Sequence, residues 1–137
     1  MKVRVQSSGR GFTILEMSMV VCLILILITM SFFGWRGVDT WKKGKAASES
    51  LRTAYIAQRA YLADNPTAKV ANLTQAMLQP YLPNNAATFP VITSLTGATL
   101  AIRVNVSPPY ATDGSATTGN RYDPSGSTTD LLWDVGE

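Results

Sequence analysis

The apolar stretch at residues 17–33, seventeen residues without a charge, limits what this chain can fold into more than any other feature of the sequence. Extending the stretch to 12–35 gives twenty-four residues that carry a single charge, at Glu16. A helix of that length rises about 36 Å, which exceeds the hydrocarbon thickness of a bilayer. Large apolar side chains occupy every face of it, so it needs lipid or other apolar helices on all sides. The stretch therefore predicts a membrane-spanning helix at 12–35.

Two simpler interpretations of this stretch are a secretory signal and a plain anchor. A secretory signal has an apolar core of about 7 to 15 residues and a small-residue cleavage site, whereas this longer run ends in Phe32, Phe33 and Trp35. A single-pass anchor fits the hydropathy better. The positive-inside rule leaves the orientation open, because basic residues stand on both sides of the run: Lys2, Arg4 and Arg10 before it, and Arg36, Lys42, Lys43 and Lys45 after it.

The composition excludes several classes of enzyme. The chain of 137 residues is long enough for about one domain. It has no histidine, and Cys22 is its only cysteine, so it can form neither a histidine-based triad, nor a zinc site, nor an internal disulfide. It also shows no acid pair, nucleophile elbow or phosphate loop, and a domain this small offers little concave surface. We therefore expect a structural or binding protein, and no enzyme.

Glu16 is the residue that a plain anchor does not need. A carboxylate near the middle of a membrane costs about 2.5 to 3.5 kcal/mol, and less near its edge, so it calls for a partner. No cation lies one turn away within the apolar run. If the chain were cut between Gly11 and Phe12, the new α-amino group of Phe12 would supply a positive charge at the same depth, on this chain or on a neighbouring copy.

The hexapeptide before the apolar run is Gly11-Phe12-Thr13-Ile14-Leu15-Glu16, and a short basic leader, residues 1–11, ends at its first glycine. Together with the apolar run, these residues resemble the cleavage and methylation motif of type IV pilin-like proteins, which include pilins and the pseudopilins of type II secretion. The layout of residues 1–64 agrees with that family, although only the hexapeptide is diagnostic.

The resemblance implies specific roles and partners. A prepilin peptidase would cut after Gly11 and N-methylate Phe12, and Glu16 would align an incoming subunit with the amine of its neighbour in a helical filament. An inner-membrane assembly platform and a motor ATPase are further implied partners. Many pilins carry a proline about twenty residues into the mature chain; this chain instead has Gly34 and Gly37 there, so any local unwinding would occur at the glycines.

Beyond the membrane the sequence stays helical. Leu51, Tyr55, Gln58 and Leu62 fall on one face, and Asp64-Asn65-Pro66 is a stop signal. These features predict one helix over 12–64, with an amphipathic half at 36–64. Residues 36–59 carry six basic and two acidic side chains; we expect this excess to solvate the helix or to touch lipid headgroups rather than to bind nucleic acid.

The remaining residues, 65–137, predict a small α+β region. A short helix is expected at 73–78, capped by Asn72, followed by antiparallel strands at 89–95 and 99–106 and a last strand at 131–135. Leu100, Ile102 and Val104 alternate with polar or small residues, which is typical of a half-buried strand. The predicted fold class is thus a type IV pilin-like α+β fold, in which the outer half of one long helix packs on a sheet of two or three strands.

Residues 107–129 are predicted to form a surface loop, because eighteen of these twenty-three residues are Ser, Thr, Gly, Pro, Asn or Asp. Asp113, Asp123, Asp130 and Asp134 in and after it are candidate calcium ligands, as in some major pseudopilins, although their spacing fits no calcium-loop pattern. No other cofactor is expected.

Three functions follow as expectations. The short C-terminal region without a disulfide favours a type II secretion pseudopilin. A type IV pilus subunit serving adhesion, motility or DNA uptake is the alternative within the family, and a single-pass membrane-anchored binding module is the alternative outside it. In the first two cases the chain would lie in a bacterial inner membrane with its C-terminal region in the periplasm, and then in a periplasmic or extracellular filament.

Overall fold

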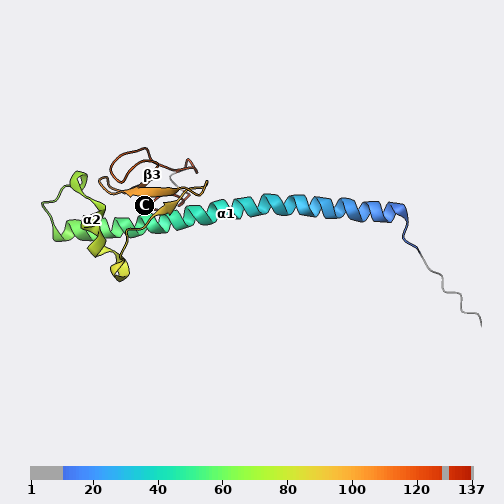
Figure 1. The fold of residues 1–137 in the computed structure, drawn as a ribbon, viewed down its shortest axis with the longest axis horizontal. Helices are drawn as coiled ribbons and strands as arrows, with labels where there is room; N and C mark the ends of the chain where they lie inside the picture. Colours follow the sequence, from blue (N-terminus) through green and yellow to red (C-terminus); the bar gives the residue numbers. More distant parts are fainter. Residues whose placement is uncertain (1–10, 128–129, 137) are drawn as a thin grey trace, which may run out of the picture. The chain divides into compact units, whose positions relative to one another are not determined.

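A computed structural model describes residues 11–127 and 130–136 of the chain. It contains two compact units, which divide between Gly37 and Val38. Helix α1 (Ile14–Asp64) contributes to both (Figure 1). The helix predicted at 12–64 is confirmed, except that it begins two residues later, where Thr13 caps it. It ends, as predicted, at the Asp64-Asn65-Pro66 stop signal.

The first unit consists of the apolar part of α1. Its large hydrophobic side chains are exposed all round the helix, from Ile14 at 91% to Ile28 at 47% of their full accessible surface. Along its most apolar window the helix buries nothing against the rest of the chain, and it is long and apolar enough to cross a membrane.

The second unit contains a three-stranded antiparallel sheet that lies beside the second half of α1 (Figure 1). The strands are β1 (Ile92–Thr93), β2 (Thr99–Arg103) and β3 (Tyr110–Thr112), in the order β1-β2-β3. Ile92 pairs with Leu100, and Ile102 pairs with Ala111. The predicted α+β layout is therefore confirmed.

The buried face of α1 consists mainly of small residues. The buried face of α1 comprises Gly44, Ala47, Ser48, Leu51, Ala54, Ala57 and Gln58. Opposite it, the predicted alternation of β2 holds: Leu100 and Ile102 are buried, as is Val104 just after the strand. Tyr55 and Leu62, which were predicted on the buried face, pack at the edge of the core instead.

The strands of the C-terminal region differ from the prediction. Those expected at 89–95 and 99–106 form only over Ile92–Thr93 and Thr99–Arg103, and two further segments differ in kind. No strand forms at 131–135, because Leu131 and Trp133 have φ angles of 59° and 62°, which a strand does not allow. The segment docks on α1 instead: the amide of Trp133 donates to the carbonyl of Gly44 (3.3 Å), and the hydroxyl of Ser48 donates to the carbonyl of Leu131 (2.8 Å). The third strand is β3, which lies inside the predicted loop at 107–129.

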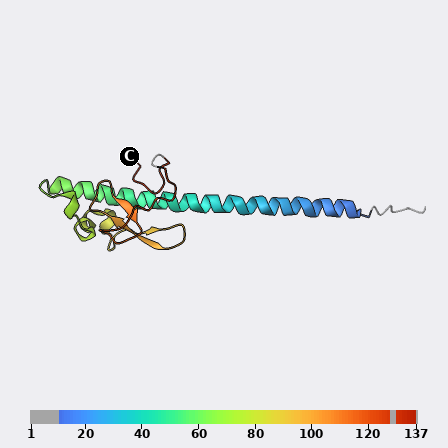
Figure 2. The ribbon, with the colours of Figure 1, turned by 90° about the horizontal axis from the view of Figure 1, so that it is seen from above.

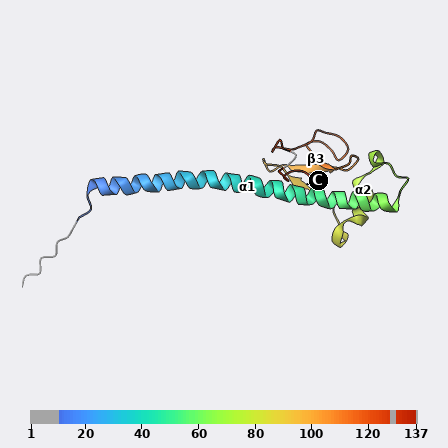
Figure 3. The same ribbon diagram turned by 180° about the vertical axis from the view of Figure 1, so that it is seen from behind.

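The short helix forms later than predicted. Helix α2 covers Gln75–Leu78 with Thr74 at its N-cap, whereas Asn72, the predicted cap, ends a 3-10 helix at Val70–Asn72. Two further 3-10 turns follow at Gln79–Tyr81 and Pro83–Asn85. Figures 2 and 3 show this yellow-green segment beside the end of α1, where the rings of Tyr61 and Tyr81 meet edge to face with centroids 5.6 Å apart.

Candidate processing and assembly site

Thr13 and Glu16 form a reciprocal cap at the start of α1. The Thr13 amide donates to Glu16 Oε2 at 2.8 Å, and the Glu16 amide donates to Thr13 Oγ1 at 3.2 Å. The Thr13 hydroxyl also donates to Glu16 Oε2 at 3.0 Å. This arrangement is a capping box, in which a threonine and a glutamate three residues later satisfy each other's free amides. The cap explains why the helix begins at Ile14.

The cap supplies Glu16 with hydrogen bonds inside its own chain, which the sequence interpretation did not foresee. The T-x-x-E spacing of Thr13 and Glu16 was the available signal. The cap leaves the charge uncompensated, because no basic side chain among residues 11–127 and 130–136 forms an ion pair with Glu16. A neutral glutamine could make the same capping contacts. The charge of Glu16, rather than its hydrogen bonding, is therefore what remains unexplained by the fold.

Gly11 and Phe12 are open to solvent. Phe12 exposes 83% of its surface. A Cβ atom added at Gly11 would meet no other atom within 4 Å, and no positive φ requires glycine there. Nothing in the described part of the chain thus requires position 11 to lack a side chain. A requirement for glycine at this position would have to come from a partner that binds the exposed segment.

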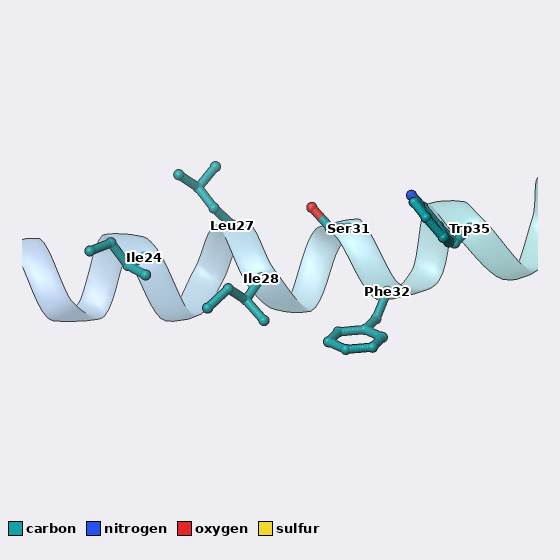
Figure 4. Close-up of a pocket in the computed structure, with 6 residues that line it drawn as sticks. All are labelled: Ile24, Leu27, Ile28, Ser31, Phe32 and Trp35. Carbon is teal, nitrogen blue, oxygen red and sulfur yellow. The ribbon is translucent and has the colours of Figure 1, made fainter.

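Two hydroxyl groups of the apolar helix form hydrogen bonds with backbone carbonyls of the same helix. The hydroxyl of Ser18 donates to the carbonyl of Leu15 at 2.9 Å, and that of Thr29 donates to the carbonyl of Ile26 at 2.8 Å. Such bonds lower the cost of placing hydroxyls in lipid. A hollow on the surface of this helix is lined by Ile24, Leu27, Ile28, Ser31, Phe32 and Trp35, whose side chains are drawn in Figure 4. The surface suits lipid tails or other apolar helices.

The four candidate calcium ligands do not form one ligand set. Asp113 accepts from the amide of Asn120, and Asp123 accepts from Ser125 and lies 3.5 Å from a guanidinium nitrogen of Arg121. Asp130 and Asp134 accept from amides two residues ahead. Among the described residues no three acidic or cysteine side chains gather around a common point. Calcium binding stays a prediction from the sequence alone.

The comparisons with known proteins add no assignment: no family model, no curated protein and no solved structure matches this chain.

Proposed function

We propose that this chain is a structural subunit of a type IV pilin-like filament, most closely a type II secretion pseudopilin. One observation carries the proposal: an exposed Gly11-Phe12 junction directly precedes a capped helix whose apolar surface is uncovered on every side. A helix with no partner of its own needs lipid before assembly and other subunits afterwards. The small α+β unit that follows would form the outer surface of the filament.

In this proposal a prepilin peptidase cuts between Gly11 and Phe12 and methylates the new amine of Phe12. The chain waits in the bacterial inner membrane with residues from 38 onward in the periplasm. An assembly platform and a motor ATPase then move it into the filament. The carboxylate of Glu16 would pair with the amine of a neighbouring copy, which neutralises two charges in an apolar core. The chain itself would carry out no chemistry.

The capping box keeps a second candidate open. Because Glu16 has a local structural role at the helix start, a single-pass membrane-anchored binding module would also account for it. The two functions differ in what they require of Glu16. A filament subunit needs its negative charge, whereas an anchor needs at most its hydrogen bonds.

Shearing of producing cells, followed by intact-mass analysis of the surface filaments, tests the proposal. A chain that begins at N-methylated Phe12 in the sheared fraction would establish a pilus subunit. A processed chain that stays in the inner membrane would favour the secretion pseudopilus or a scarce minor subunit. An uncleaved chain would contradict the family assignment and favour the anchored binding module.

A further inference from the structure

In the second unit, an exposed face of α1 carries a cluster of cations and apolar side chains. Val38, Trp41, Lys42 and Lys45 follow the spacing i, i+3, i+4, i+7, which places them on one side of the helix. All four are exposed, Val38 at 53% and Trp41 at 56%. We call these four residues the basic-aromatic face.

The adjoining side of the same turns is occupied. Gly44, Ala47, Ser48 and Leu51 are buried against the sheet and the C-terminal segment. The neighbouring acid and base are also engaged: Lys43 pairs with Asp39 at 3.0 Å and donates to the carbonyl of Leu95. Neither Lys42 nor Lys45 has a carboxylate within ion-pair distance among the described residues. The basic-aromatic face is thus available to a partner outside the chain.

We propose that the basic-aromatic face binds the headgroups of acidic phospholipids. Lysine side chains near a membrane surface attract anionic lipids, and tryptophan favours the headgroup region. Lys42 and Lys45 follow Phe33, the last residue of the apolar stretch 17–33, by nine and twelve residues. A helical path of that length rises about 14 to 18 Å, and helical side chains lean toward the N-terminus, so both ammonium groups come within about one Debye length of the headgroup charges.

Farther along the helix, the same face no longer combines exposed lysines with an exposed tryptophan. It continues through Glu49, Arg52, Ile56 and Arg59, where an acid offsets part of the positive charge. The guanidinium group of Arg59 lies over the ring of Tyr55 at 5.7 Å. Arg52 and Arg59 follow Phe33 by nineteen and twenty-six residues, beyond the reach of a headgroup in a helical path. Replacing Arg52 and Arg59 by glutamine is therefore a control: it removes two positive charges from the same face but at positions too far from the membrane to bind headgroups.

This inference rests on the membrane-spanning role proposed for α1, and it adds a function for the residues that follow. Headgroup contacts would fix the depth at which the subunit waits and would have to break when it leaves the bilayer. Each lysine close to an acidic membrane surface raises the affinity for that surface about fivefold. The two lysines should therefore give the chain a clear preference for acidic over zwitterionic lipid.

The test measures the lipid preference of the full chain in vesicles of mixed phosphatidylcholine and phosphatidylglycerol. Electron spin resonance of spin-labelled lipids compares how strongly each lipid associates with the protein. The wild-type chain should prefer phosphatidylglycerol about fivefold or more at low salt, and less in high salt. K42Q/K45Q should lower the preference several-fold, because Arg36 and the three leader cations remain, whereas K42R/K45R and R52Q/R59Q should retain the wild-type preference.

Several outcomes would overturn the inference. A wild-type preference in K42Q/K45Q, or an equal loss in R52Q/R59Q, would show that the basic-aromatic face does not bind lipid. Lower cross-linking between copies of K42Q/K45Q with an unchanged lipid preference would assign the face to a second copy of the chain. Failure of the wild-type chain to insert into vesicles would overturn both this inference and the proposed filament function, whereas insertion without lipid preference would remove only the inference.

Discussion

The carboxylate of Glu16 accepts hydrogen bonds from both the amide and the hydroxyl of Thr13, at 2.8 and 3.0 Å. The same side chain therefore has two separable properties, a capping contact within its own helix and a negative charge at the edge of an apolar segment. The capping contact is useful to any helix that starts here. The charge is useful only to a chain that brings a cation to this position. Substitutions can separate the two properties.

Glu16→Gln should abolish incorporation into filaments while it preserves the start of α1. Glutamine keeps the capping contacts and removes the charge, so cleavage and membrane insertion should continue. Thr13→Ala is the matched control: it removes the cap at a cost of about 0.5 to 2 kcal/mol but keeps the charge, and it should still assemble. The measurement is the amount of processed chain in sheared filaments. Normal filaments from Glu16→Gln would favour the membrane-anchored binding module.

Gly11→Leu should block removal of the leader without changing the stability of the fold. A Cβ atom added at position 11 meets nothing within 4 Å. The free energy of unfolding of the full chain should therefore stay within about 0.5 kcal/mol of the wild-type value. Mass analysis of membranes from cells that express a prepilin peptidase would report the cleavage. Ser8→Leu, three residues earlier in the leader, is the control and should be cut as wild type is. Efficient cleavage of Gly11→Leu would argue against a prepilin peptidase.

Gln58→Met should destabilise the second unit by about 1 to 3 kcal/mol. It leaves two carbonyls without a donor, but it also removes Gln58 Oε1, which is buried without a hydrogen-bond partner in the described part of the chain. The buried amide of Gln58 donates to the carbonyls of Val104 and Val106 at 2.9 and 2.8 Å, and each carbonyl left without a donor costs about 1 to 3 kcal/mol. Gln79→Met removes a comparable amide-to-carbonyl bond, to Ala87, at an exposed site and should cost less. Urea unfolding of the full chain in detergent compares the two. Equal losses of unfolding free energy in Gln58→Met and Gln79→Met would mean that the hydrogen bonds of Gln58 do not hold α1 to the chain after β2.

The part of the fold that the sequence could predict depends on local patterns. The apolar run and the Asp64-Asn65-Pro66 stop define α1, and the alternation around Ile102 defines β2. Gln58 was expected on the buried face only as a polar member of a helical stripe. Its role as a donor to the chain after β2 depends on two carbonyls forty-six and forty-eight residues away, which no local pattern reveals.

The two errors in the C-terminal region also have a nonlocal cause. Tyr110–Thr112 looks like part of a polar loop, and it becomes β3 because it pairs with residues 101–103 of β2. The apolar residues of 131–135 look like a strand, yet contacts with Gly44 and Ser48 hold Leu131 and Trp133 in the left-handed region. Such a conformation costs about 1 to 3 kcal/mol per residue and persists only where tertiary contacts hold it.

Tyr81→Phe should reduce the loss of stability at alkaline pH. A hydrogen bond to the Asp64 carboxylate raises the pKa of the Tyr81 phenol above its usual value of 10.0. A group whose pKa is raised by folding stabilises the fold below its unfolded pKa, and that contribution disappears as pH rises through the folded value. The difference in melting temperature between wild type and Tyr81→Phe should therefore narrow above about pH 10. A constant difference across this range would mean that the Asp64 contact does not matter.

Gly44→Ala should destabilise the second unit, although alanine favours a helix more than glycine by about 1 kcal/mol. The added Cβ would lie 2.9 Å from Trp133 Nε1 and 3.2 Å from Leu132 Cβ. Overpacking of this kind costs about 1 to 3 kcal/mol, so the net loss should be about 0 to 2 kcal/mol. Trp133 exposes 1% of its surface, and Trp133→Ala should cost more, about 3 to 5 kcal/mol.

Gly37→Ala is the matched control for Gly44→Ala, because its Cβ would meet nothing within 4 Å, and it should be neutral or slightly stabilising. Thermal unfolding of the full chain in detergent, followed by near-ultraviolet circular dichroism of the tryptophans, compares the variants. If Gly44→Ala is as stable as Gly37→Ala, the C-terminal segment does not pack on α1 at Gly44. If Gly44→Ala also loses the tryptophan signal, the close approach of Trp133 to the helix holds that segment in place.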